Sequence, residues 1–279
     1  MANNENFRIR VATFNIGDFT TLSESAGNDI RYGSGTERTR EEYLAVFKKV
    51  NADLWGLQED SEFFFYPEKI YPFDALYKNI HQNYERVFTE IYNGKAFLSS
   101  HKIKNVAPVK YPPAYPSYAP SGIPYGHPWF LTGEIEVAGK SVAIVSLHFD
   151  WQCKEKRAVQ IEAVKEFALS HKYCIIMGDF NPENRIDRQF VVDGDCITPG
   201  SKSMYKADWK RFSDAGLIHA NGEGDFGPFG TIMHNGKVDH PAPWDNIIVT
   251  PSIKILNAEA IYEPWMNDHA IVVADLEII

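Results

Sequence analysis

Residues 173–184, "YCIIMGDFNPEN", place the strongest constraint on the fold of this chain. Four apolar or nearly apolar residues predict a buried strand, which then runs into glycine, aspartate, phenylalanine, asparagine and proline. On an extended chain, residues two apart point the same way, so Asp179 and Asn181 would present a carboxylate and an amide to one spot. That spot is either a turn or a reaction centre, and the rest of the chain decides between the two.

Hydrophobic periodicity predicts two similar halves, each built as strand–helix–strand followed by further strands. Two such halves would form two packed sheets with helices outside, which is a four-layer α/β/β/α sandwich. The predicted helices cover residues 36–50 and 154–170. The predicted strands cover residues 8–15, 53–60, 84–92, 95–100, 129–137, 140–149, 174–177, 244–250, 253–261 and 270–278.

Several connections can also be predicted. Asn93-Gly94 and Ala138-Gly139 are each expected to form a two-residue hairpin turn. Residues 110–128 are rich in Pro, Tyr, Gly and Ser, which excludes a helix or a central strand. We favour a rigid surface loop there over a wall of aromatic side chains that stacks on a base or ring beside the site. The region that follows residue 184 and precedes residue 244 reads as irregular and polar.

Length and charge limit the classes of protein that fit. A chain of 279 residues suits one large α/β domain spanning residues 1–279. The net charge of -9 argues against binding to nucleic acid through bulk charge alone, although metal ions could supply local positive charge for an enzyme acting on phosphates. The 3 cysteines show no metal-ligand spacing and no disulfide framework. The polar N-terminus lacks a signal-peptide pattern and no run reaches the length of a membrane span, so we expect a cytoplasmic monomer.

Polar residues gather where the predicted strands end or begin. Taken singly, each residue is better explained by a structural role than by a functional one. An asparagine can cap a turn, a glutamate can be solvated in a loop, and a histidine can be hydrogen-bonded in the core. Their recurrence indicates instead that they converge on one edge of the sandwich, where α/β proteins commonly place their sites. These residues are Asn15, Glu59, His148, Asp179, Asn181, Asp245, Asp268 and His269.

The chemistry of such a cluster follows from its donors. Glu59 and Asp268 are hard oxygen ligands suited to Mg²⁺ or Mn²⁺. Asn15 and Asn181 are neutral groups able to hold a phosphate oxygen or a metal-bound water, and Asp179 could orient and deprotonate an attacking water. With two histidines and no thiolate, this set is poor for structural zinc and good for metal-assisted hydrolysis of a phosphoester.

The ordered motifs "TFNI", "GLQED", "SLHFD", "GDFN", "WDNIIV" and "NDHAIVVADL" span nearly the whole chain. Together they resemble the signature of the endonuclease/exonuclease/phosphatase superfamily, the DNase I-like fold. The resemblance implies a four-layer sandwich of two mostly antiparallel sheets flanked by helices. It also implies a phosphoesterase that depends on Mg²⁺ or Mn²⁺.

The resemblance further implies a metal site and a place for the reacting water. Glu59 would be the principal metal ligand, and Asp268 and Asn15 would complete the site. Asp179 and Asn181 would position the nucleophilic water and the scissile phosphate.

The histidines take the remaining roles that the resemblance implies. Asp245 and His269 would form a carboxylate–imidazole pair that contacts the phosphate or acts as base. His148 would stabilise the pentacovalent phosphorus or protonate the leaving oxygen, and the sequence leaves open which histidine is the acid. Asp239 competes with Asp245 for its position, but the apolar strand that follows directly favours Asp245.

The sequence departs from the family pattern at the positions expected to contact the substrate phosphate. Many relatives carry an Arg or Tyr on a central strand that contacts it, whereas His127 and Trp129 occupy the comparable stretch here. His101 likewise stands where relatives often have Arg. Both histidines read better as local structure than as catalytic groups.

Three functions follow, in order of preference. The first is a metal-dependent phosphodiesterase or nuclease acting on a nucleic acid or a nucleotide-like diester. The second is a phosphomonoesterase or phospholipid-type phosphatase acting on a small molecule, for which "PAPWDNIIV" offers a faint parallel to inositol polyphosphate phosphatases. The third is a non-catalytic binding module on the same fold, which is disfavoured because every expected catalytic position holds a competent residue.

Overall fold

Two β-α-β units form the skeleton of the fold. In each unit a helix carries the chain back to the starting edge of the sheet, so that the two strands pair in parallel. The first unit consists of β1 (Arg8–Asn15), α1 (Arg40–Val50) and β2 (Leu54–Gln58). The second consists of β7 (Lys140–His148), α4 (Lys154–Leu169) and β8 (Cys174–Asp179).

The structure is a computed structural model. It describes residues 7–17, 40–60, 77–81, 83–87, 94–112, 129–150, 154–182, 206–220, 232–234, 237–240, 244–261 and 269–279. Among the helices in these ranges, none is long and apolar enough to cross a membrane.

Each β-α-β unit lies at the centre of a six-stranded sheet. The first sheet has the order β13-β14-β1-β2-β4-β3 and the second the order β5-β6-β7-β8-β12-β9. All pairings other than the two parallel ones are antiparallel. The remaining elements are β3 (Asn83–Val87), β4 (Lys95–Ser99), β5 (Lys104–Lys110), β6 (Trp129–Val137), α6 (Lys206–Ser213), β9 (Ile218–His219), β12 (Asp245–Val249), β13 (Ile253–Ile261), β14 (Ile271–Ile278) and a small ribbon of β10 (Ile232–His234) and β11 (Lys237–His240).

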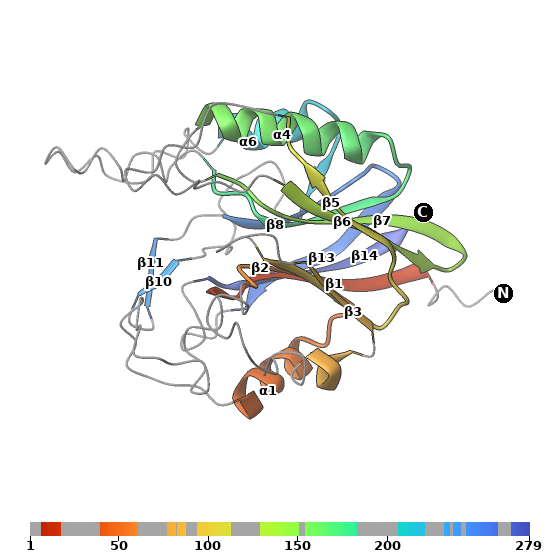
Figure 1. Cartoon of the computed structure of the whole chain (residues 1–279), viewed down its shortest axis with the longest axis vertical. Coiled ribbons are helices and arrows are strands. Elements are labelled where there is room, and N and C mark those ends of the chain that lie inside the picture. The colour runs from red at the N-terminus through yellow and green to blue at the C-terminus, as the bar shows by residue number, and fades with distance from the viewer. Residues whose placement is uncertain are drawn as a thin grey trace, which may run out of the picture.

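The two sheets pack face to face with helices on both outer faces (Figure 1). Tyr43 and Phe47 of α1 bury their rings on the first sheet, and Ile161 and Val164 of α4 pack on the second together with α6. A third apolar core fills the space between the sheets. The predicted four-layer α/β/β/α sandwich with mostly antiparallel sheets is therefore confirmed.

Strand alternation decides which side chains enter the space between the sheets. Val11 of β1, Ile175 and Met177 of β8, and Ile247 of β12 all belong to this inner core. Because side chains alternate along a strand, the same faces continue two residues further to polar groups at one edge of the sandwich. The inner core is thus apolar over most of its depth and polar at that edge.

A layer of hydrogen bonds joins the sheets directly beneath the polar edge. Gln58 donates from Nε2 to Ser146 Oγ (3.0 Å), and Ser146 donates in turn to the Leu57 carbonyl (3.0 Å). Thr13 donates to Gln58 Oε1 (3.2 Å). All three polar side chains are fully buried, and satisfying them fixes the two sheets relative to each other.

Some connections differ from the prediction. The turn at Ala138-Gly139 is confirmed, with φ of 52° and 77° and Val137 paired with Lys140. The two-residue turn at Asn93-Gly94 is wrong, because Lys95 pairs with Val87 rather than with Tyr92.

The sequence also missed several elements. The exposed edge strand β5 was not predicted, because it carries no alternating apolar pattern. Helix α6 and strands β9, β10 and β11 lie in the stretch expected to be irregular. The Pro- and Tyr-rich residues 113–128 lie outside the described residues.

Glycine at position 56 permits the close approach of the sheets. A Cβ there would lie 2.8 Å from Met177 Cβ on the facing sheet. We therefore expect Gly56→Ala to lower the free energy of unfolding by about 1–3 kcal/mol through overpacking. Chemical denaturation of the two proteins measures this difference.

Gly133→Ala is the matched control, because its added Cβ would come no closer than 3.3 Å to a neighbouring atom, Ile103 Cγ2, with Ile144 Cγ1 next at 3.4 Å. Equal denaturation midpoints for Gly56→Ala and Gly133→Ala would show that the packing of Gly56 on Met177 does not limit stability.

Candidate active site

The second sheet brings three predicted site residues level with one another. Strands β7, β8 and β12 are neighbours, and Asp179 pairs with His148 on one side and with Asp245 on the other. All three side chains are buried. Pairing across three adjacent strands explains why residues far apart in the sequence end at the same height.

Asp179 lies at the centre of this cluster. Its Oδ2 atom is 3.4 Å from His148 Nε2 and 3.8 Å from His269 Nε2, and it accepts a hydrogen bond from Asn15 Nδ2 (3.2 Å). Its Oδ1 atom accepts one from the backbone N–H of Asn181 (2.9 Å). Both oxygens of this buried carboxylate are therefore held in place by polar neighbours.

The first sheet supplies Asn15 and Glu59. The Nδ2 group of Asn15 also donates to Glu59 Oε1 (3.0 Å), so one amide joins carboxylates from both sheets. The Gly17 N–H donates to Asn15 Oδ1 (3.0 Å), which fixes the orientation of this amide. As it lies, Asn15 therefore turns Nδ2 and not Oδ1 toward the carboxylates.

Glu59 leaves the strand direction at the end of β2. Its backbone is in the left-handed region, with φ of 56°, and its side chain is partly exposed. Its Oε1 atom lies 3.9 Å from His148 Nε2. This carboxylate is thus the accessible member of the cluster.

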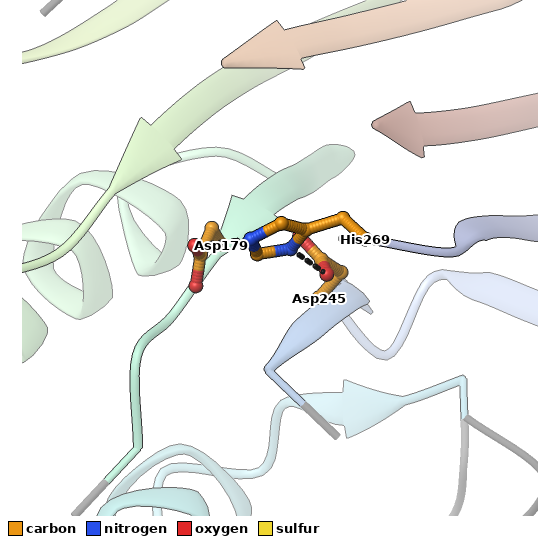
Figure 2. Close-up of side chains that lie close together, drawn as sticks. All are labelled: Asp179, Asp245 and His269. Carbon is orange, nitrogen blue, oxygen red and sulfur yellow. Dashed lines mark hydrogen bonds and ion pairs between the residues drawn. The ribbon is translucent and has the colours of Figure 1, made fainter. Parts of the chain in front are cut away.

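His269 and Asp245 form a hydrogen-bonded pair. The distance from Nδ1 to Asp245 Oδ2 is 2.7 Å, and Figure 2 shows the imidazole lying between the two aspartates. Because a carboxylate only accepts, Nδ1 carries the proton and Nε2 faces Asp179. Trp244, fully buried, lies beside this imidazole with ring centroids 6.3 Å apart.

Asn181 reaches the site by a different geometry from the one predicted. Strand β8 ends at Asp179, and Asn181 has φ of 40°, so the two residues do not share an extended chain. The side chain of Asn181 donates from Nδ2 to the Phe149 carbonyl (3.0 Å). The expectation that both side chains point the same way along a strand is therefore wrong, although Asn181 still contacts Asp179 through its backbone.

An aromatic cluster that the sequence did not predict supports this turn. Phe180 packs edge-on against Phe149 and Phe212, with ring centroids 5.4 and 5.7 Å apart, and against Trp209 at 5.1 Å. Its N–H donates to the Trp244 carbonyl (2.8 Å). Anchoring Phe180 fixes the backbone on both sides of it. Only the helical spacing of Trp209 and Phe212 could have indicated this support.

A buried lysine also lies beside the cluster. Lys95 begins β4, opposite Gln58, and its Nζ lies 4.2 Å from the ring centroid of Trp129. Burial lowers the pKa of Lys95 to about 7, and the negative charge of Glu59 acts in the opposite direction. A lysine at the start of an otherwise apolar buried strand was the signal in the sequence.

The sequence profile of the Endonuclease/Exonuclease/phosphatase family matches residues 12–214, which is well over half of the chain. The chain belongs to this family. A sequence comparison with curated proteins finds no match.

Solved structures with the same fold cover nearly all of this chain. An endonuclease/exonuclease/phosphatase from Beutenbergia cavernae superposes with a TM-score of 0.63 at 18% identity, covering 97% of this chain and 72% of that one. A family protein from Bacteroides thetaiotaomicron gives 0.62 at 16% identity, covering 98% of each. TDP2 from D. rerio, in complex with a single-strand DNA product, gives 0.58 at 11% identity, covering 97% and 99%. At these identities the likeness establishes the DNase I-like fold alone.

Most of the predicted site residues meet at one edge of this family fold. Asp268 lies outside the described residues, and His101 follows Ser99 at the far end of β4. The residues that the structure brings together are Asn15, Glu59, His148, Asp179, Asn181, Asp245 and His269.

The donor set fits a divalent metal ion. One ligand atom from each of Asp179, Asp245 and His269 lies within 4.8 Å of the others, and all three residues are buried. Glu59 and Asn15 adjoin this group. Oxygen-rich sites with imidazole and without thiolate suit Mg²⁺ or Mn²⁺.

Crowded carboxylates predict that a cation stabilises the protein. We expect Mg²⁺ or Mn²⁺ to raise the melting temperature over that in EDTA, since a ligand present at 100 times its Kd adds about 2.7 kcal/mol to the free energy of unfolding. Glu59→Gln should reduce this shift most, and differential scanning fluorimetry over a metal titration measures it.

Glu166→Gln, at an exposed position of α4, is the control and should respond to metal like the wild type. An unchanged metal titration in Glu59→Gln would contradict the role of Glu59.

Proposed function

We propose that this protein is a divalent-metal-dependent phosphodiesterase that hydrolyses a nucleic acid or a nucleotide-like diester by attack of water. Members of its family are phosphoester hydrolases. The observation that carries the proposal is the contact of one buried carboxylate, Asp179, with two imidazoles and with Asn15 from the opposite sheet. Such a juxtaposition of acceptors and donors suits proton transfer near neutral pH.

In this proposal Glu59, Asp268 and Asn15 hold Mg²⁺ or Mn²⁺. The ion would polarise a phosphoryl oxygen and offset the negative charge that builds up during hydrolysis. Support comes from the accessible carboxylate of Glu59 and from the adjoining group of Asp179, Asp245 and His269, whose spacing suits a metal. Asn15 would have to turn Oδ1 toward the ion, giving up its hydrogen bond from Gly17.

The reacting water belongs next to Asp179. This carboxylate orients the water and takes its proton, while Asn181 supports the orientation through its N–H on Oδ1. The water oxygen then attacks phosphorus, and one ester oxygen leaves with a proton.

The two imidazoles serve the phosphate and the leaving oxygen. Asp245 holds Nδ1 of His269 and stabilises its protonated form, which can donate from Nε2 to a phosphate oxygen. His148 lies on β7, on the other side of β8 from Asp245, and its Nε2 protonates the leaving oxygen. Both nitrogens lie within 4 Å of Asp179 Oδ2, at 3.4 and 3.8 Å, so they serve one reacting centre.

A diester substrate is favoured over a monoester. The similar TDP2 structure contains a single-strand DNA product. The net charge of -9 disfavours a long duplex, because duplex binding draws on many basic contacts. Trp244 belongs to the stretch that parallels inositol polyphosphate phosphatases. It is fully buried in the outer core of the second sheet, so packing alone explains the tryptophan and it does not support a monoester substrate.

Removing either central group should abolish hydrolysis. We expect Asp179→Asn and His269→Ala each to lower kcat about 10²–10⁴-fold, the usual contribution of a positioned acid or base. The assay uses bis(p-nitrophenyl) phosphate with Mg²⁺ or Mn²⁺, alongside p-nitrophenyl phosphate, single- and double-stranded DNA, and RNA.

Asp214→Asn, exposed just after α6, and His101→Ala are the matched controls and should retain wild-type rates. Wild-type rates in Asp179→Asn or His269→Ala would remove the site assignment. Hydrolysis of the monoester alone would replace the diesterase with a phosphomonoesterase, and no turnover with any metal would favour a binding module.

A further inference from the structure

A lysine of the first sheet lies level with the end of β2, where Glu59 begins. Lys95 opens β4 and pairs with Gln58, and the ladder continues past it, since the Asp60 N–H donates to the Gly94 carbonyl (3.1 Å). Phe97, two residues further, faces the space between the sheets, so Lys95 points into the same space. Its side chain therefore enters the inner core at the polar edge and not at the surface.

The lysine reaches across to the second sheet. Its Nζ lies 4.2 Å from the ring centroid of Trp129, which begins β6 and is buried in the inner core. Leu131 of β6 pairs with Ser146 of β7, so Trp129 and His148 each lie two residues further along toward the same edge. The ammonium thus extends from the first sheet, which carries Glu59, to a residue of the second sheet.

Burying an ammonium at this position costs desolvation free energy, which negative charge in the site offsets. Lys95 is fully buried, so its ammonium is shielded from water. Nearby Glu59 offsets part of this cost. An incoming phosphate would add negative charge in the same place, and the indole face favours the charged form of the amine.

We propose that Lys95 binds a non-bridging oxygen of the substrate phosphate and that the Trp129 ring holds its ammonium in position. This inference rests on the proposed phosphodiesterase function. The cation would reach the phosphate from the first sheet, with the Trp129 indole of the facing sheet beside it. Lys95 is then a substrate-binding residue that lies on the first sheet, opposite the imidazoles of the second.

The test compares Lys95→Met with Lys140→Met in the full-length protein. Lys140 is a matched control, because it also lies over aromatic rings, 5.1 Å from Phe7 and 5.2 Å from Tyr173, at the turn that begins β7. Calorimetric titration with inorganic phosphate in saturating Mg²⁺ gives binding, and bis(p-nitrophenyl) phosphate gives KM and kcat.

We expect Lys95→Met to weaken phosphate binding and to raise KM about 10- to 100-fold, the scale of one lost charge-assisted hydrogen bond, with a smaller change in kcat. Lys95→Arg should recover part of this loss, and Lys140→Met should match the wild type. Trp129→Phe keeps an aromatic face but weakens the interaction with the ammonium, so it should show an intermediate loss of phosphate binding.

Unchanged phosphate binding and KM in Lys95→Met, with an altered Mg²⁺ titration, would overturn the proposal and leave Lys95 as a counter-charge to Glu59. If Lys95→Met does not fold, wild-type phosphate binding in Trp129→Phe overturns it. A wild-type protein that binds phosphate through Lys95 but hydrolyses no ester would refute the proposed function alone. A wild-type enzyme that is active and insensitive to Lys95→Met would refute this inference alone.

Discussion

The hydrogen bond from Asn15 Nδ2 to Asp179 Oδ2, at 3.2 Å, crosses from one sheet to the other, and the site depends on the packing that makes it possible. The sheets meet closely because Gly56 leaves room for Met177 and because Ser146 hydrogen-bonds across the interface with Gln58 and with the Leu57 carbonyl. A wider separation would divide the cluster into two unconnected sets of polar strand ends. Close packing in the apolar part of the core therefore maintains the geometry of the side chains at its polar edge.

The same packing imposes an electrostatic cost. Asp179 and Asp245 are fully buried and Glu59 is partly so, all within one cluster. Buried carboxylates are costly without cations or hydrogen bonds, and here two imidazoles, one amide and the ammonium of Lys95 surround them. This arrangement lowers the stability of the protein but places anionic groups where they can bind a cation and act on a phosphate. Functional sites commonly combine these two effects.

Local patterns predicted most of the fold and which of the described polar residues gather at one edge of it. Alternation and the β-α-β order sufficed to place residues as distant as Asn15 and His269 at one edge, because paired parallel strands end at the same edge and an antiparallel neighbour such as β14 begins there. The sequence could not give the left-handed turn at Asn181 or the support of Phe180 by α6, since both depend on tertiary contacts. Lys95 was overlooked because a lysine in a strand usually marks an exposed position, whereas this one is buried against Trp129.

In the proposed function, one edge of the sandwich binds a divalent cation beside the groups that carry out hydrolysis. Anomalous diffraction from crystals soaked in Mn²⁺ tests it most directly. We expect a manganese peak within coordinating distance of Glu59, about 2.0–2.2 Å from an oxygen as for other small divalent ions. A map with no peak at this edge, or with peaks only at distant surface carboxylates, would contradict it.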